Sequence, residues 1–378
     1  MTNQPTTAAP VVGAERITNL DTVRGIALLG ILLMNAVSFG LPQAAYFNLD
    51  AAGSDTPLDW VIGILGEIFV DQKFMGLFSL LFGAGIVLFC DRAEAKGRRA
   101  VALSLSRNAI LLIIGVIHSV FWEGDILLVY ALASPVLLAA RRLPPRALIG
   151  LGLGVILLSP LTAIIAQSSI DADGTDLGGY WWVDADDFGE ATELYVIVDV
   201  FARAIGMMLI GVALYRTGLL NGTRPAAEYR RLAAWGLGLG IPLATASVVW
   251  FAATDFGPEA ALVGTIPNTI GTVPMVLGYL AISSLWNQRE ETGLHLRLRA
   301  VGRMALTNYL AQTALGLTIL GWALDGTDLT RTGILVFCVA VWAVQLAWSP
   351  WWLDRFRFGP VEWLWRVATY RRITPLRR

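Results

Sequence analysis

The sequence is poor in charged residues, cysteine and histidine. Only 15% of its 378 residues are charged, whereas 56% are hydrophobic, and the mean hydropathy is +0.61. These values exclude an ordinary soluble domain, in which about a quarter of the residues are charged. The two cysteines, Cys90 and Cys338, lie in different apolar segments, and there are two histidines. Neither a disulfide framework nor a zinc-ligand spacing follows, so we expect no bound metal.

Long apolar stretches take the place of the missing charges. A helix that spans a bilayer needs roughly 20 mainly apolar residues. Stretches near that length lie at 24–41, 74–90, 105–122, 124–141, 147–166, 194–215, 231–253, 262–286, 301–323 and 331–350. We therefore predict an all-α polytopic helical bundle with about ten transmembrane helices in a lipid bilayer, and the transmembrane domain covers 16–353.

The charges of the connecting loops alternate in sign. Basic clusters run from Arg92 to Arg107, Arg141 to Arg146, Arg216 to Arg231, Arg289 to Arg303 and Arg355 to Arg378. Acidic clusters lie between them, from Asp50 to Asp59, Glu123 to Asp125, Asp171 to Glu193, Asp255 to Glu259 and Asp325 to Asp328. Because cytoplasmic loops retain Lys and Arg, both termini are predicted to be cytoplasmic. The net charge of −1 hides this segregation, and we expect no nucleic-acid partner.

Two segments before the second apolar stretch have a different character. Residues 1–15 are polar and rich in Pro, Thr and Ala, which predicts a disordered cytoplasmic tail. The segment 59–73 contains the charged residues Glu67, Asp71 and Lys73. Only one net crossing fits between the flanking loops, so we expect an interfacial or re-entrant segment buried against protein.

Two further segments lie outside the predicted spans. The loop 167–193 is rich in Gly, Asp and Trp, which fits either a cap over an external opening or a solvated loop. The tail 354–378 alternates Trp and Arg on a short helix, a pattern typical of a cytoplasmic interfacial anchor.

The first apolar segment carries polar residues on one helical face. Arg24 and Asn35 are eleven residues apart, which is three turns with about 20° left over, and Asp21 lies within roughly 60° of Arg24. The stripe climbs ~16 Å from a cytoplasmic ion pair to an amide. It should face protein, because polar groups that face lipid are costly. The alternative is that Arg24 is an orientation anchor and Asn35 an interhelical contact.

The third apolar segment repeats this interval. Arg107, near the cytoplasm, is followed eleven residues later by His118, toward the external end. Glu123 and Asp125 come shortly afterwards, so an imidazole has two carboxylates close in sequence at the outer surface. A histidine in a span is a functional candidate because its ordinary pKa lies near neutrality. The alternative is that His118 is structural and Arg107 an anchor.

The remaining polar residues have structural explanations. Arg203 follows Asp199 by one helical turn, and we expect the pair to be structural. His295 lies in a charged cytoplasmic loop and is expected to be solvated. Asn308 and Gln312 form another polar stripe, and its structural explanation is helix packing.

Six motifs, taken in order, carry a family resemblance. They read "LDTVRGIALLGILLMN", "GLPQAAYFN", "KFMGLFSLLFGAG", "IGVIHSVFWEGDILLVYAL", "GRMALTNYLAQT" and "GPVEWLWR". Over nearly the whole chain they resemble the YeiB-type family of bacterial membrane proteins, which implies a place in the cytoplasmic (inner) membrane. The first motif is also similar to the signature of a wider group of transmembrane acyltransferases, which includes the lysosomal heparan-glucosaminide N-acetyltransferase.

The wider group implies a mechanism in which cytoplasmic acyl-CoA delivers an acyl group to an acceptor on the far side. In the lysosomal enzyme's motif, an asparagine matching Asn35 is followed about eleven residues later by a catalytic histidine. The matching position here is Tyr46. Tyrosine is a poor base at neutral pH because its ordinary pKa is near 10. His118 is our substitute candidate.

Our hypothesis is acyl transfer from acyl-CoA, in the first place acetyl-CoA. His118 would be the base, Glu123 or Asp125 would fix its tautomer, and Asn35 would donate to the thioester carbonyl. The residues expected to bind acyl-CoA are Arg24, Asp21, Arg107, Arg303 and Asn308. We find no covalent nucleophile beside a base, so direct transfer is favoured.

Two other classes of function stay open. A transporter or channel would also use intramembrane Arg, Asp and His, although the sequence lacks the two related halves of many transporters. A membrane scaffold would use the polar stripes only to hold helices together. The acidic outer mouth hints at a small amine or sugar acceptor. The sequence leaves the oligomeric state open, a homodimer included.

Overall fold

The computed structural model describes residues 17–185, 187–325 and 327–378. The predicted tail at 1–15 lies outside these residues. The helices are α1 (Thr18–Gly40), α2 (Ala44–Phe47), α3 (Pro57–Phe69), α4 (Lys73–Glu94), α5 (Ala100–Ser119), α6 (Ile126–Ala140), α7 (Pro145–Ile156), α8 (Leu158–Gln167), α9 (Glu190–Arg216), α10 (Ala226–Ala253), α11 (Ile266–Asn287), α12 (Gly293–Arg303), α13 (Ala305–Gly316), α14 (Arg331–Arg355) and α15 (Pro360–Tyr370). Short helical turns are η2 (Thr175–Tyr180), η3 (Leu219–Asn221), η4 (Pro258–Ala260), η5 (Val263–Thr265) and the π-helix η6 (Leu317–Ala323).

The predicted all-α bundle is confirmed. Among the described residues, eight helical segments are long and apolar enough to cross a membrane: Thr18–Gly40, Pro57–Glu94, Ala100–Ser119, Pro145–Gln167, Glu190–Arg216, Ala226–Ala253, Val263–Asn287 and Arg331–Arg355. The two other predicted spans correspond to α6, an apolar helix of 15 residues, and to α13 with η6. The count of ten and the orientation stay predictions.

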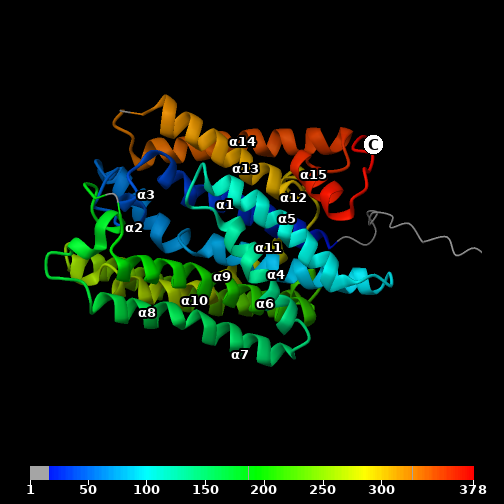
Figure 1. The fold of residues 1–378 in the computed structure, drawn as a ribbon, viewed down its shortest axis with the longest axis horizontal. Coiled ribbons are helices and arrows are strands. Elements are labelled where there is room, and N and C mark those ends of the chain that lie inside the picture. Colours follow the sequence, from blue (N-terminus) through cyan, green and yellow to red (C-terminus); the bar gives the residue numbers. More distant parts are fainter. Residues whose placement is uncertain (1–16, 186, 326) are drawn as a thin grey trace, which may run out of the picture.

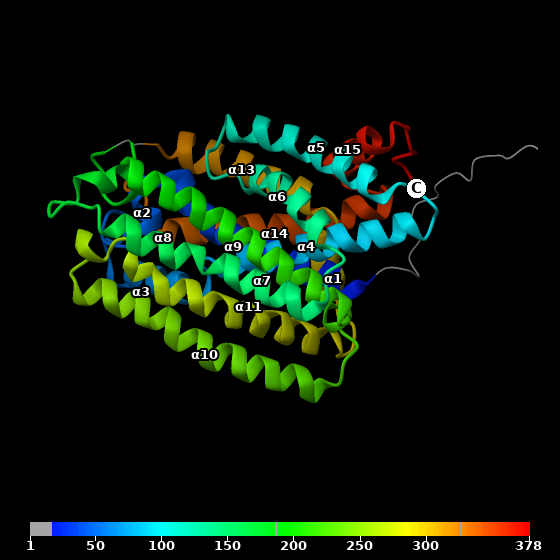
Figure 2. The same ribbon diagram turned by 60° about the horizontal axis from the view of Figure 1, so that its bottom comes forward.

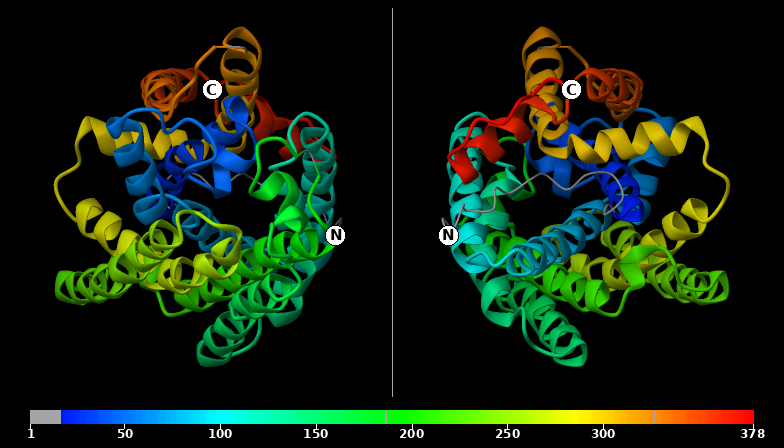
Figure 3. Two further views of the ribbon diagram at one scale, coloured as in Figure 1. Left: turned by 90° about the vertical axis from the view of Figure 1, so that its left-hand side faces the viewer. Right: turned by 90° about the vertical axis from the view of Figure 1, so that its right-hand side faces the viewer.

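The long helices run side by side along the long axis of the molecule (Figures 1 and 2). We call the end that holds the start of α1 and the chain's C-terminus the basic end. The opposite end, with the loop residues 168–185 and 187–189, is the acidic end. In the end-on views of Figure 3, α7, α8 and α10 lie on the outside of the bundle. They expose large apolar side chains there, as expected of a surface that faces lipid.

Glycines allow the inner helices to approach closely. A methyl group on Gly211 of α9 would overlap the carbonyl oxygen of Leu80 on α4, and one on Gly83 of α4 would overlap that of Met208 on α9. Such contacts between small residues are how membrane helices gain packing energy, because lipid chains supply no hydrophobic drive between them. The α4–α9 crossing therefore depends on these two glycines.

A break separates α3 from α4 and interrupts what would otherwise be one apolar helix. The N–H groups of Val70 and Asp71 both bond to the carbonyl of Gly66, and Gln72 takes a φ of 63°, in the left-handed region. The predicted segment at 59–73 thus consists of α3 and this break. Exposed apolar residues form a stripe along α3: Leu58, Val61, Leu65 and Phe69. Its interfacial or re-entrant placement stays a prediction.

The expectation for His295 is wrong. The side chain is buried, stacks on Trp286 with ring centroids 3.7 Å apart, and forms a capping box with Thr292. The physical reason is that the charged loop folds into α12, which packs closely on α1: a methyl group on Gly25 would overlap the Leu298 carbonyl oxygen. The histidine lies on the buried side of that helix.

We predict that Gly211→Ala weakens the α4–α9 crossing. The added methyl group would force the helices apart, so we expect a loss of about 1–3 kcal/mol in unfolding free energy. Thermal unfolding in detergent measures it. Gly85→Ala in α4 is the matched control, because its methyl group would meet nothing within 4 Å. Equal melting temperatures for the two variants would show that the crossing does not need a glycine.

Candidate functional site

His118 and Asp125 form a buried pair at the turn between α5 and α6. The Nδ1 atom of His118 lies 2.8 Å from the Asp125 carboxylate. The other oxygen of that carboxylate accepts the Leu128 N–H at 3.0 Å and so caps α6. His118 Nε2 is buried and has no hydrogen-bond partner among the described residues. One ring nitrogen is thus fixed by a carboxylate while the other is left for a further partner.

Aromatic side chains surround this pair. The Tyr309 hydroxyl of α13 donates to Asp125 at 3.3 Å, and its ring centroid lies 5.3 Å from that of His118. The Trp122 ring lies 5.9 Å from the His118 ring, edge to face. The α5–α6 turn stops short of the loops at the acidic end (Figures 1 and 2). The pair therefore sits within the bundle rather than on its outermost surface.

Helix α1 presents one face to this turn. The Trp122 indole N–H donates to the Ser38 hydroxyl at 3.3 Å, and the Trp122 and Phe39 rings are 4.9 Å apart. Asn35 shares that face, since residues three and four positions apart are neighbours on a helix. The half-buried Asn35 amide makes no hydrogen bond to His118 among the described residues. Asn35 therefore lies on the face of α1 that packs against the α5–α6 turn, but its side chain does not bond to His118.

The two predicted carboxylates differ in their surroundings. Asp125 is buried against His118, whereas Glu123 is exposed and forms no hydrogen bond or ion pair in the described part of the chain. Of the two, Asp125 is the carboxylate placed to fix the histidine tautomer.

Arginines gather at the basic end. Arg24 pairs with Asp21 at 3.3 Å. The Arg107 guanidinium lies over the Trp365 ring, 4.1 Å from its centroid, and Arg24 and Arg366 are near enough for their charges to act on it. Arg366, on α15, could not be assigned to this group from the sequence, because only the docking of the tail brings it there.

Arg303 and Asn308 lie in different surroundings. Arg303 ends α12, and the preceding Gly302 touches the Asp21 backbone, so this residue also lies at the basic end. Asn308 is fully buried, and its amide bonds to Val301, Ser349 and Trp348. Because these contacts join α13 to α14, we leave Asn308 out of the proposed acyl-CoA contact.

Tyr46 lies away from the histidine pair. It lines a cavity of about 340 Å³ between α1, α3 and α14, together with Glu67, Asp71 and Arg331. Burial, with Asp71 nearby, raises the pKa of the Tyr46 phenol above its ordinary value. The phenol stays protonated at neutral pH and cannot act as the base.

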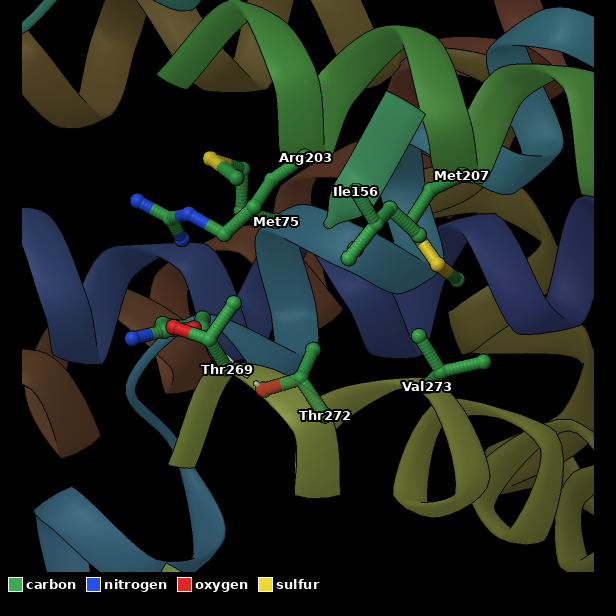
Figure 4. Close-up of a pocket in the computed structure, with 9 residues that line it drawn as sticks. Met75, Ile156, Arg203, Met207, Thr269, Thr272 and Val273 are labelled. Carbon is green, nitrogen blue, oxygen red and sulfur yellow. Dashed lines mark hydrogen bonds between the residues drawn. The ribbon is translucent and has the colours of Figure 1, made fainter. Parts of the chain in front are cut away.

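Asp199 and Arg203 form the expected ion pair on α9. Arg203 donates to both Asp199 oxygens, and Ser159 of α8 donates to one of them at 2.5 Å. In Figure 4 Arg203 lies near Met75 of α4, across from Thr269 and Thr272 of α11. These side chains border a cavity of about 10 Å³, enough for about one water. The pair thus neutralises two charges inside the bundle.

Comparison with known proteins finds relatives over nearly the full length. The chain is 35% identical over 386 residues to the uncharacterized protein YeiB of Escherichia coli (strain K12), covering 96% of this chain and 98% of that protein. It is 30% identical over 413 residues to the uncharacterized protein YxaH of Bacillus subtilis (strain 168), covering 97% of each. Residues 214–372 match the family "Protein of unknown function (DUF418)". The YeiB-type resemblance is confirmed, whereas the relation to acyltransferases stays a proposal.

Glu362 fixes α15, the helix that carries Arg366, to the bundle. Its carboxylate accepts the N–H groups of Leu306 and Thr307 at 2.8 and 3.0 Å, at the start of α13. We predict that Glu362→Ala costs about 1–3 kcal/mol, because those donors lose their partner. Trypsin cleavage after Arg366 should become faster. Glu290→Ala, an exposed loop carboxylate, is the control, and equal cleavage rates would contradict the docking role.

Proposed function

The chain belongs to the YeiB-type family of membrane proteins, and from that premise we propose that it is a transmembrane acyltransferase. It would move an acyl group, in the first place acetyl, from cytoplasmic acyl-CoA to an amine or sugar-like acceptor on the external side of the bacterial inner membrane. The proposal places the basic end, with both termini, in the cytoplasm, because the arginines gather there.

One observation carries this proposal: a buried histidine whose Nδ1 faces a carboxylate while its Nε2 has no partner in the described residues. A carboxylate at Nδ1 favours the tautomer with a proton there, which leaves the lone pair on Nε2. Such an imidazole can take a proton from a hydroxyl or amine. The Tyr309 hydroxyl, which also bonds to Asp125, holds the carboxylate in place.

Acyl transfer then requires two groups from the protein, a general base and a hydrogen-bond donor to the carbonyl oxygen. Acyl-CoA supplies the thioester carbonyl, and the acceptor's oxygen or nitrogen forms a bond to that carbon as the carbon–sulfur bond breaks. His118 Nε2 takes the acceptor's proton and returns it to the departing thiolate. The Asn35 amide, on the α1 face that touches Trp122, is the donor proposed for the carbonyl oxygen.

The basic end supplies the groups for the nucleotide part of acyl-CoA. Arg24, Arg107 and Arg303 lie there, and Arg366 joins them through α15. Guanidinium groups pair with phosphates through charge-assisted hydrogen bonds. Asp21 holds Arg24 in place.

One observation favours transport as a second candidate. The break between α3 and α4 places irregular backbone among buried charged groups, as the broken helices of many transporters do.

Saturable binding of acyl-CoA to the purified protein supports the enzyme. Substrate flux into liposomes without such binding supports transport.

We predict that Arg24→Ala weakens acyl-CoA binding about tenfold to a hundredfold, because a charge-assisted phosphate contact is lost. Isothermal titration with acetyl-CoA measures the dissociation constant. Arg230→Ala, an exposed arginine at the start of α10, serves as the control. An unchanged constant in folded Arg24→Ala would leave Arg24 as an orientation anchor.

We predict that His118→Ala keeps acyl-CoA binding and lowers transfer by ~10²–10⁴, the usual contribution of a general base. Asp125→Asn should lower transfer as well, because the amide favours the wrong tautomer.

Asn35→Ala should show a defect that is less than additive with His118→Ala, if both serve one transition state. The assay is transfer of a labelled acetyl group from CoA to amine or sugar acceptors in detergent.

Glu123→Gln is the matched control for these variants, because Glu123 is the exposed carboxylate of the same turn. Full turnover in His118→Ala would sink the assignment of the base. A large defect in Glu123→Gln would instead show that the outer carboxylate takes part.

A further inference from the structure

The cavity between α1, α3 and α14 combines apolar walls with a few polar groups. Its apolar lining includes Leu33, Met34, Val37, Ile334 and Leu335. Its polar lining residues include Tyr46, Glu67, Asp71 and Arg331. The volume of about 340 Å³ falls in the range of small-molecule sites, which have this composition.

The cavity borders the exposed apolar surface of α3. Leu65 and Phe69 line it and also belong to the exposed stripe along that helix. A molecule with an apolar chain can therefore reach the cavity from the bilayer, between α3 and α14, without crossing the bundle.

Both carboxylates of the cavity wall already face cations. The charges of Lys73 and Arg331 act on Glu67, and that of Lys73 also acts on Asp71. An anionic head would meet the two carboxylates, and a cationic head would meet a wall whose carboxylates are already paired. Because a charge is costly to bury without a counter-ion of its own, we expect an occupant with an uncharged head.

Two polar groups of the cavity have no hydrogen-bond partner in the described part of the chain: the Tyr46 hydroxyl and the Glu67 carboxylate. They are near enough for the Glu67 charge to act on the Tyr46 phenol. By contrast, Asp71 accepts a hydrogen bond from Asn268 at 3.0 Å, and Arg331 already donates two hydrogen bonds. The free hydrogen-bonding capacity is thus one phenol donor and one carboxylate acceptor.

These two groups define the chemistry of an uncharged head. An ionised carboxylate only accepts hydrogen bonds, so the head has to donate to Glu67, and it has to accept from the Tyr46 phenol. Esters, ethers and ketones only accept. A hydroxyl group has one donor and two acceptor lone pairs, so a single oxygen atom serves both residues.

We propose that this cavity binds an uncharged lipid alcohol, whose hydroxyl donates to Glu67 and accepts from Tyr46 while its apolar chain lies against α1 and α14. The site is separate from His118, and the inference goes beyond acyl transfer and does not depend on it. Both a free long-chain alcohol and a monoacylglycerol carry this chemistry.

The test uses purified full-length protein in phosphatidylcholine nanodiscs and a dodecanol analogue with a diazirine at the chain end. We expect saturable photolabelling of peptides from α3 and α14, with competition by dodecanol. Its methyl ether, which cannot donate, and dodecylamine, which is charged, should compete about tenfold less well. Monolaurin identifies the source, since stronger competition than by dodecanol points to an acylglycerol and weaker competition to a free alcohol.

Two variants probe the recognition of the hydroxyl. Tyr46→Phe should raise the half-saturating concentration about twofold to tenfold, the usual effect of one neutral hydrogen bond. Glu67→Gln should narrow the preference for dodecanol over its methyl ether, because a glutamine amide can donate to the ether oxygen. The matched controls are Tyr215→Phe, at the C-terminal end of α9, and Asp55→Asn, an exposed carboxylate; both should behave as the native protein does.

A third variant probes the chain. Gly66→Leu should abolish labelling by filling the cavity, because a side chain at Gly66 meets nothing within 4 Å. Gly85→Leu, another open helical glycine, is the control and should label normally.

Three outcomes overturn the proposal: no saturable labelling, equal competition by the methyl ether, or unchanged labelling in Gly66→Leu. An unchanged half-saturating concentration in Tyr46→Phe overturns the role of the phenol, and an unchanged preference over the ether in Glu67→Gln overturns that of the carboxylate. Melting temperatures of all variants are measured first. If Glu67→Gln does not fold, Glu67→Asp replaces it, and its shorter side chain should weaken binding of dodecanol.

Discussion

A charge inside an apolar bundle has to be satisfied by the protein itself, and in this chain that constraint centres on the ammonium of Lys73. The side chain is fully buried and donates to the Glu67 carbonyl at 2.6 Å and to the Asn268 amide. Asn268 in turn donates to Asp71. These bonds tie the end of α3, the start of α4 and the start of α11 to one point. Removing one of these residues would leave a buried charge uncompensated. That costs far more free energy than burying the intact network. The break between α3 and α4, and the cavity beside it, are fixed by this network.

The features that the sequence could predict are those set by neighbouring residues. Spans follow from the length of apolar stretches, and His118 and Asp125 are only seven residues apart across one turn, so their contact is local. Tyr309 is 184 residues from Asp125, and the tail brings Arg366 near Arg107, which lies far earlier in the chain. The spacing of residues along the sequence does not predict contacts between residues so far apart. His295 shows the same limit, because a charged loop predicts solvent whereas packing of α12 on α1 buries it.

The position of a polar residue in a span does not determine its role. Asn308 and Asn35 have the same side chain and both follow an arginine in a predicted motif. The Asn308 amide donates to Val301 of α12 and Ser349 of α14 and accepts from Trp348 of α14. The Asn35 side chain has no hydrogen bond among the described residues. A saturated amide stabilises packing and has nothing left to offer a ligand. Hydrogen-bond saturation, which only the folded chain reveals, separates the two roles.

The faces of α1 keep the two polar sites apart. Leu33, Met34 and Val37 line the cavity beside α3, whereas Ser38 and Phe39 contact Trp122. At 100° per residue, Asn35 points between Ser38 and Phe39 and away from Met34 and Val37. An amide on this face cannot act on a group held beside Tyr46, which lines the cavity on the other face. Position 46 is a tyrosine, and the histidine at position 118 is paired with a carboxylate. The proposed acid–base chemistry therefore belongs on the α5 side of α1, whereas the opposite face lines the cavity beside α3 and α14.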